Sequence, residues 1–406
     1  MMMEILLGIS VFTGIIMALA FIVLAARSVL MPKGLARINV NGERTVDADI
    51  GEKLLAALEH GGVHLPTTCG GVGTCGLCRV TVAGAEEALP IERSTLSEIE
   101  IANGVRLACQ WVVRDDLDIA VAPDLLSSET WICTVRETRT VAPLIKEIVL
   151  NLPEGKGRSF RAGSYVQITA PPFTLPFSAI AVDSAHEAAW THMGLRKLTA
   201  RNDVPVARAY SLANHPGETD VLLLNIRLAL PPVGKPDAPP GVVSSYLFGL
   251  KPGDAVKVSG PYGNFFATDS TREMILIGGG VGMAPLRAHV FEQLEFRKSG
   301  RAISYWYGAR GRIDLYYADE MERLAREHDN FSWHVVLSDP APGDDWDGEV
   351  GYIHDVVFRN YLRDHPDPAA CEYYLCGPPL MIEATRTLLD KLGVAGENIF
   401  YDDFGG

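Results

Sequence analysis

The chain has 406 residues, of which 48% are hydrophobic and 21% are charged. This composition excludes a largely disordered chain, a collagen and a polytopic membrane protein. The length predicts two or three domains, because a single hydrophobic core stops growing at roughly 250–300 residues. Fifty acidic against 36 basic residues give a formal net charge of -14, which would repel phosphate backbones, so nucleic acid is not expected as a partner.

The N-terminal segment predicts one transmembrane anchor. Residues 5–26 carry no charged side chain, and at 1.5 Å per helical residue they cover the roughly 30 Å hydrocarbon core of a bilayer. A cleaved signal peptide is the alternative, but no Lys or Arg precedes the apolar stretch. Arg27, Lys33 and Arg37 follow the stretch, so the positive-inside rule leaves the remaining chain in the cytoplasm.

The next stretch, 34–128, predicts a small α+β domain. It contains fourteen Asp and Glu against seven Lys and Arg, which fits either a solvated acidic surface or a docking face for a basic electron-transfer partner. Its expected elements, in chain order, are a strand at 36–40, a turn at Asn41-Gly42, a strand at 44–46, a helix at 53–60 ended by Gly61-Gly62, and a strand at 79–82.

Four cysteines of this domain form the most specific motif of the chain. The first three are spaced C-x5-C-x2-C in a Gly-rich loop, and thirty residues separate the third from the fourth. Four thiolates can hold a [2Fe-2S] cluster, and glycines let the loop wrap closely around it. Structural zinc usually takes paired C-x2-C knuckles, whereas this motif has one. The predicted ligands are Cys69, Cys75, Cys78 and Cys109.

Residues 34–128 resemble a [2Fe-2S] ferredoxin of β-grasp fold. The first arm of the motif is one residue longer than that of plant ferredoxins, C-x4-C-x2-C. An arm of this length is similar to those of vertebrate-type ferredoxins and of ferredoxin domains fused to reductases. The resemblance implies an electron-transfer domain whose cluster is held by the four cysteines.

Short β runs punctuated by Gly and Pro follow in 129–268, and they predict an antiparallel barrel or sandwich. The stretch 173–205 has no clean period and is expected to be a long loop, either functional or mobile. The strands expected in this domain lie at 145–150, 165–169, 221–230 and 255–258.

Two signatures of this domain suggest a flavin site. Arg208, Tyr210 and Ser211 can supply a phosphate contact, a stacking ring and a hydrogen bond, although an ordinary edge strand would explain them alone. Small residues then open a helix that can present N–H and hydroxyl donors to a pyrophosphate. These are Gly241, Val242, Val243, Ser244 and Ser245.

In this order the two signatures resemble the flavin domain of the ferredoxin-NADP reductase superfamily. The resemblance implies FAD, with Tyr210 against the isoalloxazine, Ser211 near its N5 and Arg208 on the pyrophosphate. An aromatic residue near the C-terminus often shields the flavin in this superfamily, and Phe404 has a comparable place.

From 269 to 406 strands and helices alternate, which predicts a parallel sheet with helices on both faces, a Rossmann-like α/β domain. A Gly-rich turn joins the first strand to the first helix, where a dinucleotide pyrophosphate can approach the backbone closely. Its residues are Gly278, Gly279, Gly280, Gly282 and Pro285. The expected strands lie at 274–277, 303–307, 332–337 and 372–375, and the expected helices at 286–297, 317–327 and 381–392.

A later signature, Cys376-Gly377-Pro378, resembles the second nicotinamide-binding motif of the same superfamily. The resemblance implies that Cys376 borders the site of hydride transfer. Cys133 and Cys371 are expected to be buried small residues.

The whole chain resembles the F subunits of sodium-translocating NADH:quinone oxidoreductases. The resemblance implies a component of a bacterial inner-membrane complex, which takes hydride from NADH onto FAD and passes single electrons through the cluster to other membrane subunits and finally to quinone. Two alternatives are the reductase of a phenol-hydroxylase-type oxygenase, which needs no anchor, and a tethered binding module with degenerate sites. The expected divisions are the anchor 1–33, the ferredoxin domain 34–128, the FAD domain 129–268 and the NADH domain 269–406.

Overall fold

The computed structural model divides the chain into two compact units. The first consists of Met1–Leu65 with Gly71–Leu126, and the second of Pro66–Gly70 with Ser127–Gly406. None of the helices that the structure describes is both long enough and apolar enough to span a membrane. Most of the predicted anchor lies outside the described residues. The residues that the structure describes are 12–19, 21, 34–67, 69–122, 125, 128–157, 160–232, 234, 238–263 and 265–403.

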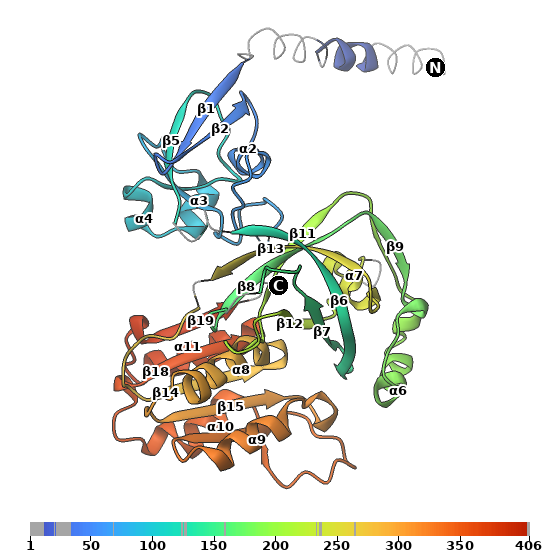
Figure 1. The fold of residues 1–406 in the computed structure, drawn as a ribbon, viewed down its shortest axis with the longest axis vertical. Helices are drawn as coiled ribbons and strands as arrows, with labels where there is room; N and C mark the ends of the chain where they lie inside the picture. The colour runs from blue at the N-terminus through green and yellow to red at the C-terminus, as the bar shows by residue number, and fades with distance from the viewer. Residues whose placement is uncertain are drawn as a thin grey trace. The chain divides into compact units, whose positions relative to one another are not determined.

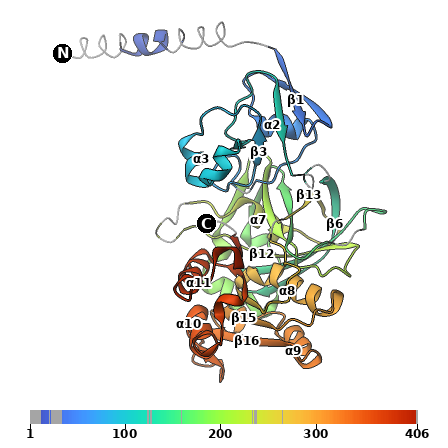
Figure 2. The same cartoon turned by 90° about the vertical axis from the view of Figure 1, so that its left-hand side faces the viewer.

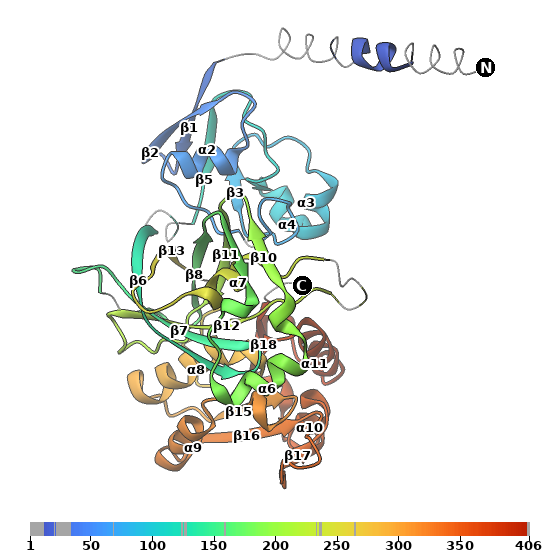
Figure 3. The same ribbon diagram turned by 90° about the vertical axis from the view of Figure 1, so that its right-hand side faces the viewer.

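The first unit is built on a five-stranded mixed sheet of order β2-β1-β5-β3-β4, in which β1 and β5 are parallel (Figure 3). The predicted hairpin is confirmed: Asn41 and Gly42 have φ of 54° and 72°, and Val40 pairs with Arg44 across a three-residue turn. The elements are β1 (Leu35–Val40), β2 (Arg44–Asp49), α2 (Leu54–His60), β3 (Arg79–Val82), α3 (Pro90–Thr95), α4 (Glu98–Ala102), β4 (Val105–Leu107) and β5 (Leu117–Ala120).

The second unit begins with a six-stranded antiparallel sheet of order β11-β8-β13-β6-β7-β12. A bridge between Leu212, the residue after β11, and Leu224 in the middle of β12 joins the two edge strands, so the sheet closes into a barrel. This decides between the predicted barrel and sandwich. The elements are β6 (Glu129–Ala142), β7 (Ile145–Asn151), β8 (Ser164–Ala170), β11 (Val206–Ser211), β12 (Val221–Arg227), α7 (Val242–Gly249) and β13 (Ala255–Gly263).

The expectation of a long loop at 173–205 is wrong, because this stretch forms regular structure. Trp190 is fully buried, donates to the Pro143 carbonyl at 2.6 Å and contacts the rings of Phe177 and Phe248. Its helix buries only His186 and Trp190, so the sequence shows no helical period. The elements are β9 (Phe173–Pro176), η1 (Phe177–Ala179), α6 (Ser184–His192), η2 (Leu195–Lys197) and β10 (Thr199–Asn202). β9 and α6 are labelled in Figure 1, and β9 pairs with β10.

A parallel sheet of order β17-β16-β15-β14-β18-β19 completes the second unit. Alternate residues of β14 face two cores: Met274 and Leu276 pack with α8 and α9, and Ile275 and Ile277 pack with α10 and α11 (Figure 2). The predicted helices on both faces are therefore confirmed. Sequence analysis missed β17, α10 and β19.

The elements of this part are β14 (Met274–Gly279), η3 (Gly280–Gly282), α8 (Met283–Phe291), η4 (Glu292–Phe296), β15 (Ile303–Ala309), η5 (Arg312–Asp314), α9 (Ala318–Glu327), β16 (Phe331–Leu337), β17 (Glu349–Val350), α10 (Ile353–Asn360), η6 (Leu362–Asp364), η7 (Pro368–Ala370), β18 (Glu372–Gly377), α11 (Pro379–Lys391), η8 (Gly396–Asn398) and β19 (Ile399–Asp403).

Candidate functional site

Three of the predicted cluster ligands, Cys75, Cys78 and Cys109, belong to the first unit. Cys78 and Cys109 are buried, and a hydrogen bond between their thiols, together with burial and the charge of Cys75, raises the pKa of Cys78 well above its ordinary value. Thiols gathered in this way disfavour ionisation until a metal balances their charge, so the donor set fits an iron–sulfur cluster. Cys69 is partly exposed and groups with Pro66–Gly70 in the second unit.

Glu92, a buried carboxylate that sequence analysis missed, fixes the backbone near the predicted cluster ligands. Glu92 is 2% exposed, and its two oxygens accept from the backbone N–H groups of Leu89 at 2.9 Å and Leu107 at 2.8 Å. The Ala108 N–H donates to the carbonyl of Cys78 at 2.9 Å. Glu92 therefore anchors the strand that leads directly to Cys109.

The predicted flavin residues lie on β11, next to β8. Arg208 and Tyr210 share one face because side chains alternate along a strand, and Ser211 points to the other. Tyr210 packs against the barrel core, and burial raises its pKa. The Ser211 hydroxyl donates to Oδ2 of Asp402 at 2.7 Å, a residue 191 positions away that sequence analysis did not consider.

Helix α7 offers donors at its N-terminus. Gly241 precedes the helix, and among the described residues no side chain caps this end, so the first N–H groups are available to an anion. Ser245 is fully buried, and its hydroxyl has no hydrogen-bond partner among the described residues. The Ser244 hydroxyl instead accepts from Ala229 N–H at 3.2 Å and donates to the Gly241 carbonyl at 3.1 Å. These groups fit a pyrophosphate, with Ser244 shaping the turn.

The two valines between these residues contribute differently from the serines. Val243 is 2% exposed within the barrel core, and Val242 packs against that core. Their side chains are therefore committed to packing, and only their backbone N–H groups can serve a ligand.

The Gly-rich turn of the parallel sheet forms η3, immediately before α8. Gly280 has φ of +56°, and a Cβ there would meet nothing within 4 Å. Two phenols, those of Tyr307 and Tyr316, donate to its carbonyl at 3.0 and 2.9 Å. Because a trans peptide points its C=O and N–H in opposite directions, this carbonyl sets the direction of the Val281 N–H.

The remaining members of the turn bring the backbone close to its neighbours. A Cβ on Gly282 would lie 1.9 Å from the Cys376 carbonyl oxygen. Gly282 thus lets the first nucleotide signature pack directly on the second. At Gly278 a Cβ would meet Leu286 at 2.7 Å, and at Gly279 it would meet Met381 at 3.0 Å. Pro285 is buried in the first turn of α8, where proline is tolerated.

The second nucleotide signature ends β18. Cys376 is 0% exposed, Gly377 is buried, and Pro378 is exposed before α11. Asp402 is the register partner of Cys376 on the neighbouring strand β19. The bond from Ser211 to Asp402 therefore joins β11, the predicted flavin strand, to β19, the edge strand of the parallel sheet. Phe404 lies outside the described residues.

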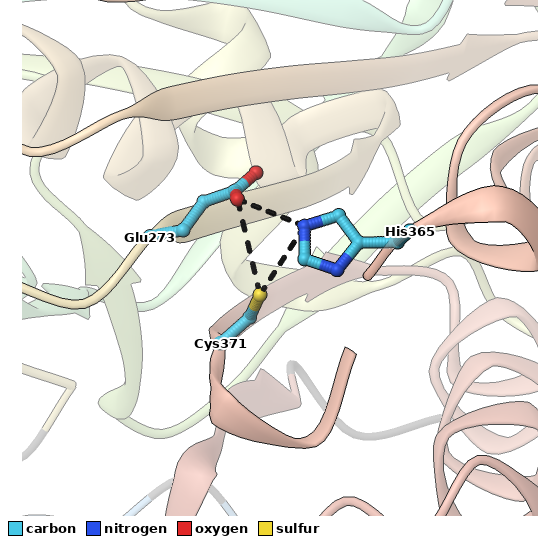
Figure 4. A group of neighbouring side chains, drawn as sticks. All are labelled: Glu273, His365 and Cys371. Atoms are coloured by element: carbon cyan, nitrogen blue, oxygen red, sulfur yellow. Dashed lines mark hydrogen bonds and ion pairs between the residues drawn. The ribbon is translucent and has the colours of Figure 1, made fainter. Parts of the chain in front are cut away.

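Cys133 and Cys371, both expected to be buried small residues, differ in their surroundings. Cys133 is 0% exposed in the barrel core, and burial raises its pKa to about 12. Cys371 lies beside Glu273 and His365, with its sulfur 3.8 Å from His365 Nε2 (Figure 4). Burial and the Glu273 charge raise the pKa of this thiol to about 12.

This Glu–His–Cys group has the residue types of a metal site, but its hydrogen bonds favour another role. His365 Nδ1 accepts from the Asp367 N–H at 3.2 Å, so the ring hydrogen sits on Nε2 and donates to Glu273 at 3.0 Å. A metal on Nε2 would need that hydrogen on Nδ1, facing another donor. The group instead links the starts of β14 and β18.

Three family models match successive parts of the chain. They are a 2Fe-2S iron-sulfur cluster binding domain at residues 38–114, an oxidoreductase FAD-binding domain at 191–266 and an oxidoreductase NAD-binding domain at 276–387. The chain is 47% identical over 407 residues to the F subunit of the Na(+)-translocating NADH-quinone reductase of Methylococcus capsulatus, with 100% of both chains covered. The corresponding F subunit of Neisseria meningitidis is 47% identical over 405 residues, with the same coverage.

The chain belongs to the family of these F subunits. Marinomonas sp. has a further member, 46% identical over 405 residues, which covers 100% of the chain and 99% of that protein. The [2Fe-2S], FAD and NAD cofactors expected from the sequence agree with the three domain models.

Solved structures of reductases share the fold of this family member. An Amycolatopsis cytochrome P450 reductase, GcoB, has a TM-score of 0.63 and 29% identity, over 91% of this chain and 98% of that one. The ferredoxin reductase in carbazole 1,9a-dioxygenase has a TM-score of 0.60 and 22% identity, over 92% and 99%. The higher identity of the F subunits over the full length disfavours the alternative of an oxygenase reductase.

Proposed function

We propose that the chain is the electron-input component of a sodium-translocating NADH:quinone reductase. It takes hydride from NADH onto FAD and passes single electrons through a [2Fe-2S] cluster toward the other membrane subunits, with quinone as the eventual acceptor. The names of the full-length relatives and the order of the three cofactor-binding domains support this function. FAD can accept a hydride and release electrons singly, as a one-electron cluster requires.

The contact between Ser211 and Asp402 carries the proposal for the hydride-transfer site. Asp402 Oδ2 holds the Ser211 hydroxyl at 2.7 Å, and Asp402 pairs in register with Cys376. The proposed flavin strand and the proposed nicotinamide signature thus meet at one hydrogen bond. In this role Asp402 accepts the Ser211 hydrogen and so fixes the hydroxyl, whose oxygen borders the flavin edge, and Cys376 borders the nicotinamide.

The remaining residues bind the two dinucleotides in this proposal. Tyr210 stacks against the isoalloxazine and excludes water from it, while Arg208 neutralises pyrophosphate charge. The N-terminal N–H groups of α7 and the Ser245 hydroxyl donate to that pyrophosphate. The N-terminus of α8 and the turn at Gly280 receive the pyrophosphate of NADH. Phe404 shields the flavin, a role that rests on its place in the sequence.

The cluster ligands, domain divisions and location complete the proposal. The cluster is held by Cys69, Cys75, Cys78 and Cys109, and the domains keep the divisions at 34–128, 129–268 and 269–406. The uncharged stretch 5–26 anchors the chain once in the bacterial inner membrane, with the cofactor domains in the cytoplasm, where NADH is found. The basic residues after this stretch support that orientation.

Stopped-flow reduction of the bound FAD by NADH tests the proposed site. Ser211→Ala and Asp402→Ala each remove the Ser211–Asp402 bond, and each should retain FAD but slow flavin reduction roughly tenfold or more, since a fixed polar group is lost at the reacting edge. The double variant should be scarcely slower than either single one, because both remove the same bond. Thr387→Ala, an exposed α11 hydroxyl bonded to Glu383, is the control. Parental rates in both single variants would refute the site.

A further inference from the structure

A glutamine beside the fourth cluster cysteine reaches back across the loop. Gln110 Nε2 donates to Cys109 Sγ at 3.4 Å and to the Gly71 carbonyl at 3.0 Å. All three residues lie in the first unit. The side chain therefore connects one predicted ligand sulfur to the loop that carries the other three predicted ligands.

The hydrogen bonds settle which way the amide points. The –NH2 group has two hydrogens, and each has an acceptor here, a sulfur and a carbonyl oxygen. The reverse orientation would place the amide oxygen against both acceptors, so Nε2 must face the sulfur. A metal-bound thiolate is also only an acceptor, so this donor remains suited to it.

The backbone of Gln110 is held independently of its side chain. Its N–H donates to the Leu107 carbonyl at 2.8 Å, and the Lys53 ammonium donates to its carbonyl at 3.0 Å. The side chain lies against Gly73, where a Cβ would come within 2.9 Å of Nε2 and where φ is +96°. The backbone hydrogen bonds of Gln110 and the packing of its side chain against Gly73 together direct the amide toward Cys109.

We propose that Gln110 raises the reduction potential of the [2Fe-2S] cluster through its N–H···S bond to Cys109. This rests on the proposed ligand set, in which Cys109 binds iron. Reduction adds negative charge to the cluster and its sulfurs, and an N–H donor to a ligand sulfur stabilises the more negative state. Gln110 is therefore a positioning residue that makes the cluster a better electron acceptor.

Redox titration of the full chain, followed by the EPR signal of the reduced cluster, tests the proposal. Gln110→Met keeps the length of the side chain and removes both donors, so the midpoint potential should fall. Gln110→Glu keeps the shape and adds a negative charge, so the potential should fall further. Thr95→Val is the matched control for a lost polar contact to the same loop, because the Thr95 hydroxyl donates to the Ile91 carbonyl at 2.7 Å and lies 3.3 Å from the Gly73 carbonyl.

Iron and sulfide content separates the inference from the proposed function. A parent chain without iron and sulfide would refute the cluster itself. An unchanged potential in a fully loaded Gln110→Met protein would refute only the role of Gln110, as would an equal fall in Thr95→Val. If Gln110→Met loses its cluster, parent protein labelled with [15N]glutamine gives a second test. Electron spin-echo envelope modulation should then show a weak 15N coupling, which is absent from Gln110→Glu; its absence from the parent would overturn the inference.

Discussion

His289 shows how a single buried residue links stability to pH. It is 0% exposed on α8, its Nε2 lies 2.9 Å from the Phe265 carbonyl, and its ring contacts Phe265 and Tyr374. Burial lowers its pKa to about 3 from the ordinary 6.5. The neutral ring therefore donates from Nε2, and the folded chain resists protonation that the unfolded chain accepts.

Acid should therefore destabilise the second unit through His289. Because the folded pKa lies below the unfolded one, the stabilising contribution is complete above about pH 6.5 and is lost as the pH falls toward 3. The loss is about 1.4 kcal/mol per pH unit in that window. His289→Gln keeps a donor without titrating there, so calorimetry at pH 7 and pH 5 should show a smaller drop in melting temperature for this variant. Equal drops in variant and parent would contradict the assignment.

At the scale of the elements, the turn between β14 and α8 depends on close approach between backbone segments. Two phenols donate hydrogen bonds to the Gly280 carbonyl, and Gly282 packs on the end of β18. Among the described residues no side chain caps the N-terminus of α8, where a dinucleotide pyrophosphate is proposed to bind. The turn can adopt this geometry because Gly282 has no side chain.

Gly282→Ala should disrupt nucleotide binding while leaving the flavin in place. Its Cβ would lie 1.9 Å from the Cys376 oxygen, a backbone atom that cannot rotate away, so the turn or the end of β18 must move. We expect the Kd for NAD to rise roughly tenfold or more, as misplaced contacts cost more than about 1.4 kcal/mol. Gly396→Ala, where a Cβ meets nothing within 4 Å, is the control. An unchanged Kd, measured by titration of the flavin absorbance, would show that the turn tolerates the side chain.

At the scale of the molecule, the chain consists of two compact units, and the predicted anchor is the N-terminal part of the first. Separate hydrophobic cores fill the ferredoxin-like sheet, the barrel and each face of the parallel sheet. Among the residues that the structure describes, none before Ala36 belongs to these cores. The stability of both units should thus be independent of the anchor.

Deletion of residues 1–33 should leave a chain that retains FAD and the cluster and oxidises NADH with an artificial acceptor. It should no longer sediment with membranes or join the other subunits, because the proposed anchor is gone. Cofactor absorbance, ferricyanide reduction and membrane flotation measure these outcomes. A truncated chain that still floats with protein-free vesicles would contradict the anchor. In the full chain, cleavage of the cofactor domains by protease added to the periplasmic side would contradict the orientation.

The sequence by itself determined the features that depend on neighbouring residues. The turn at Asn41-Gly42, the strand and helix periods of the parallel sheet and the spacing of the four cysteines are local patterns, and local geometry imposes them. The resemblance to the reductase superfamily supplied the order of cofactors, which the domain models then matched. Stretch 173–205 was misjudged because its helix buries too few side chains to leave a period.

Only the tertiary structure decided which distant groups meet. Asp402 reaches Ser211 across 191 positions, and Gln110 reaches Gly71 across 39. The same holds for the two tyrosines on the Gly280 carbonyl and for the closure of the barrel between Leu212 and Leu224. Such contacts follow from strand order and register, which pair residues irrespective of their separation in the chain, and a single sequence has no local signal for a partner that folding alone brings near.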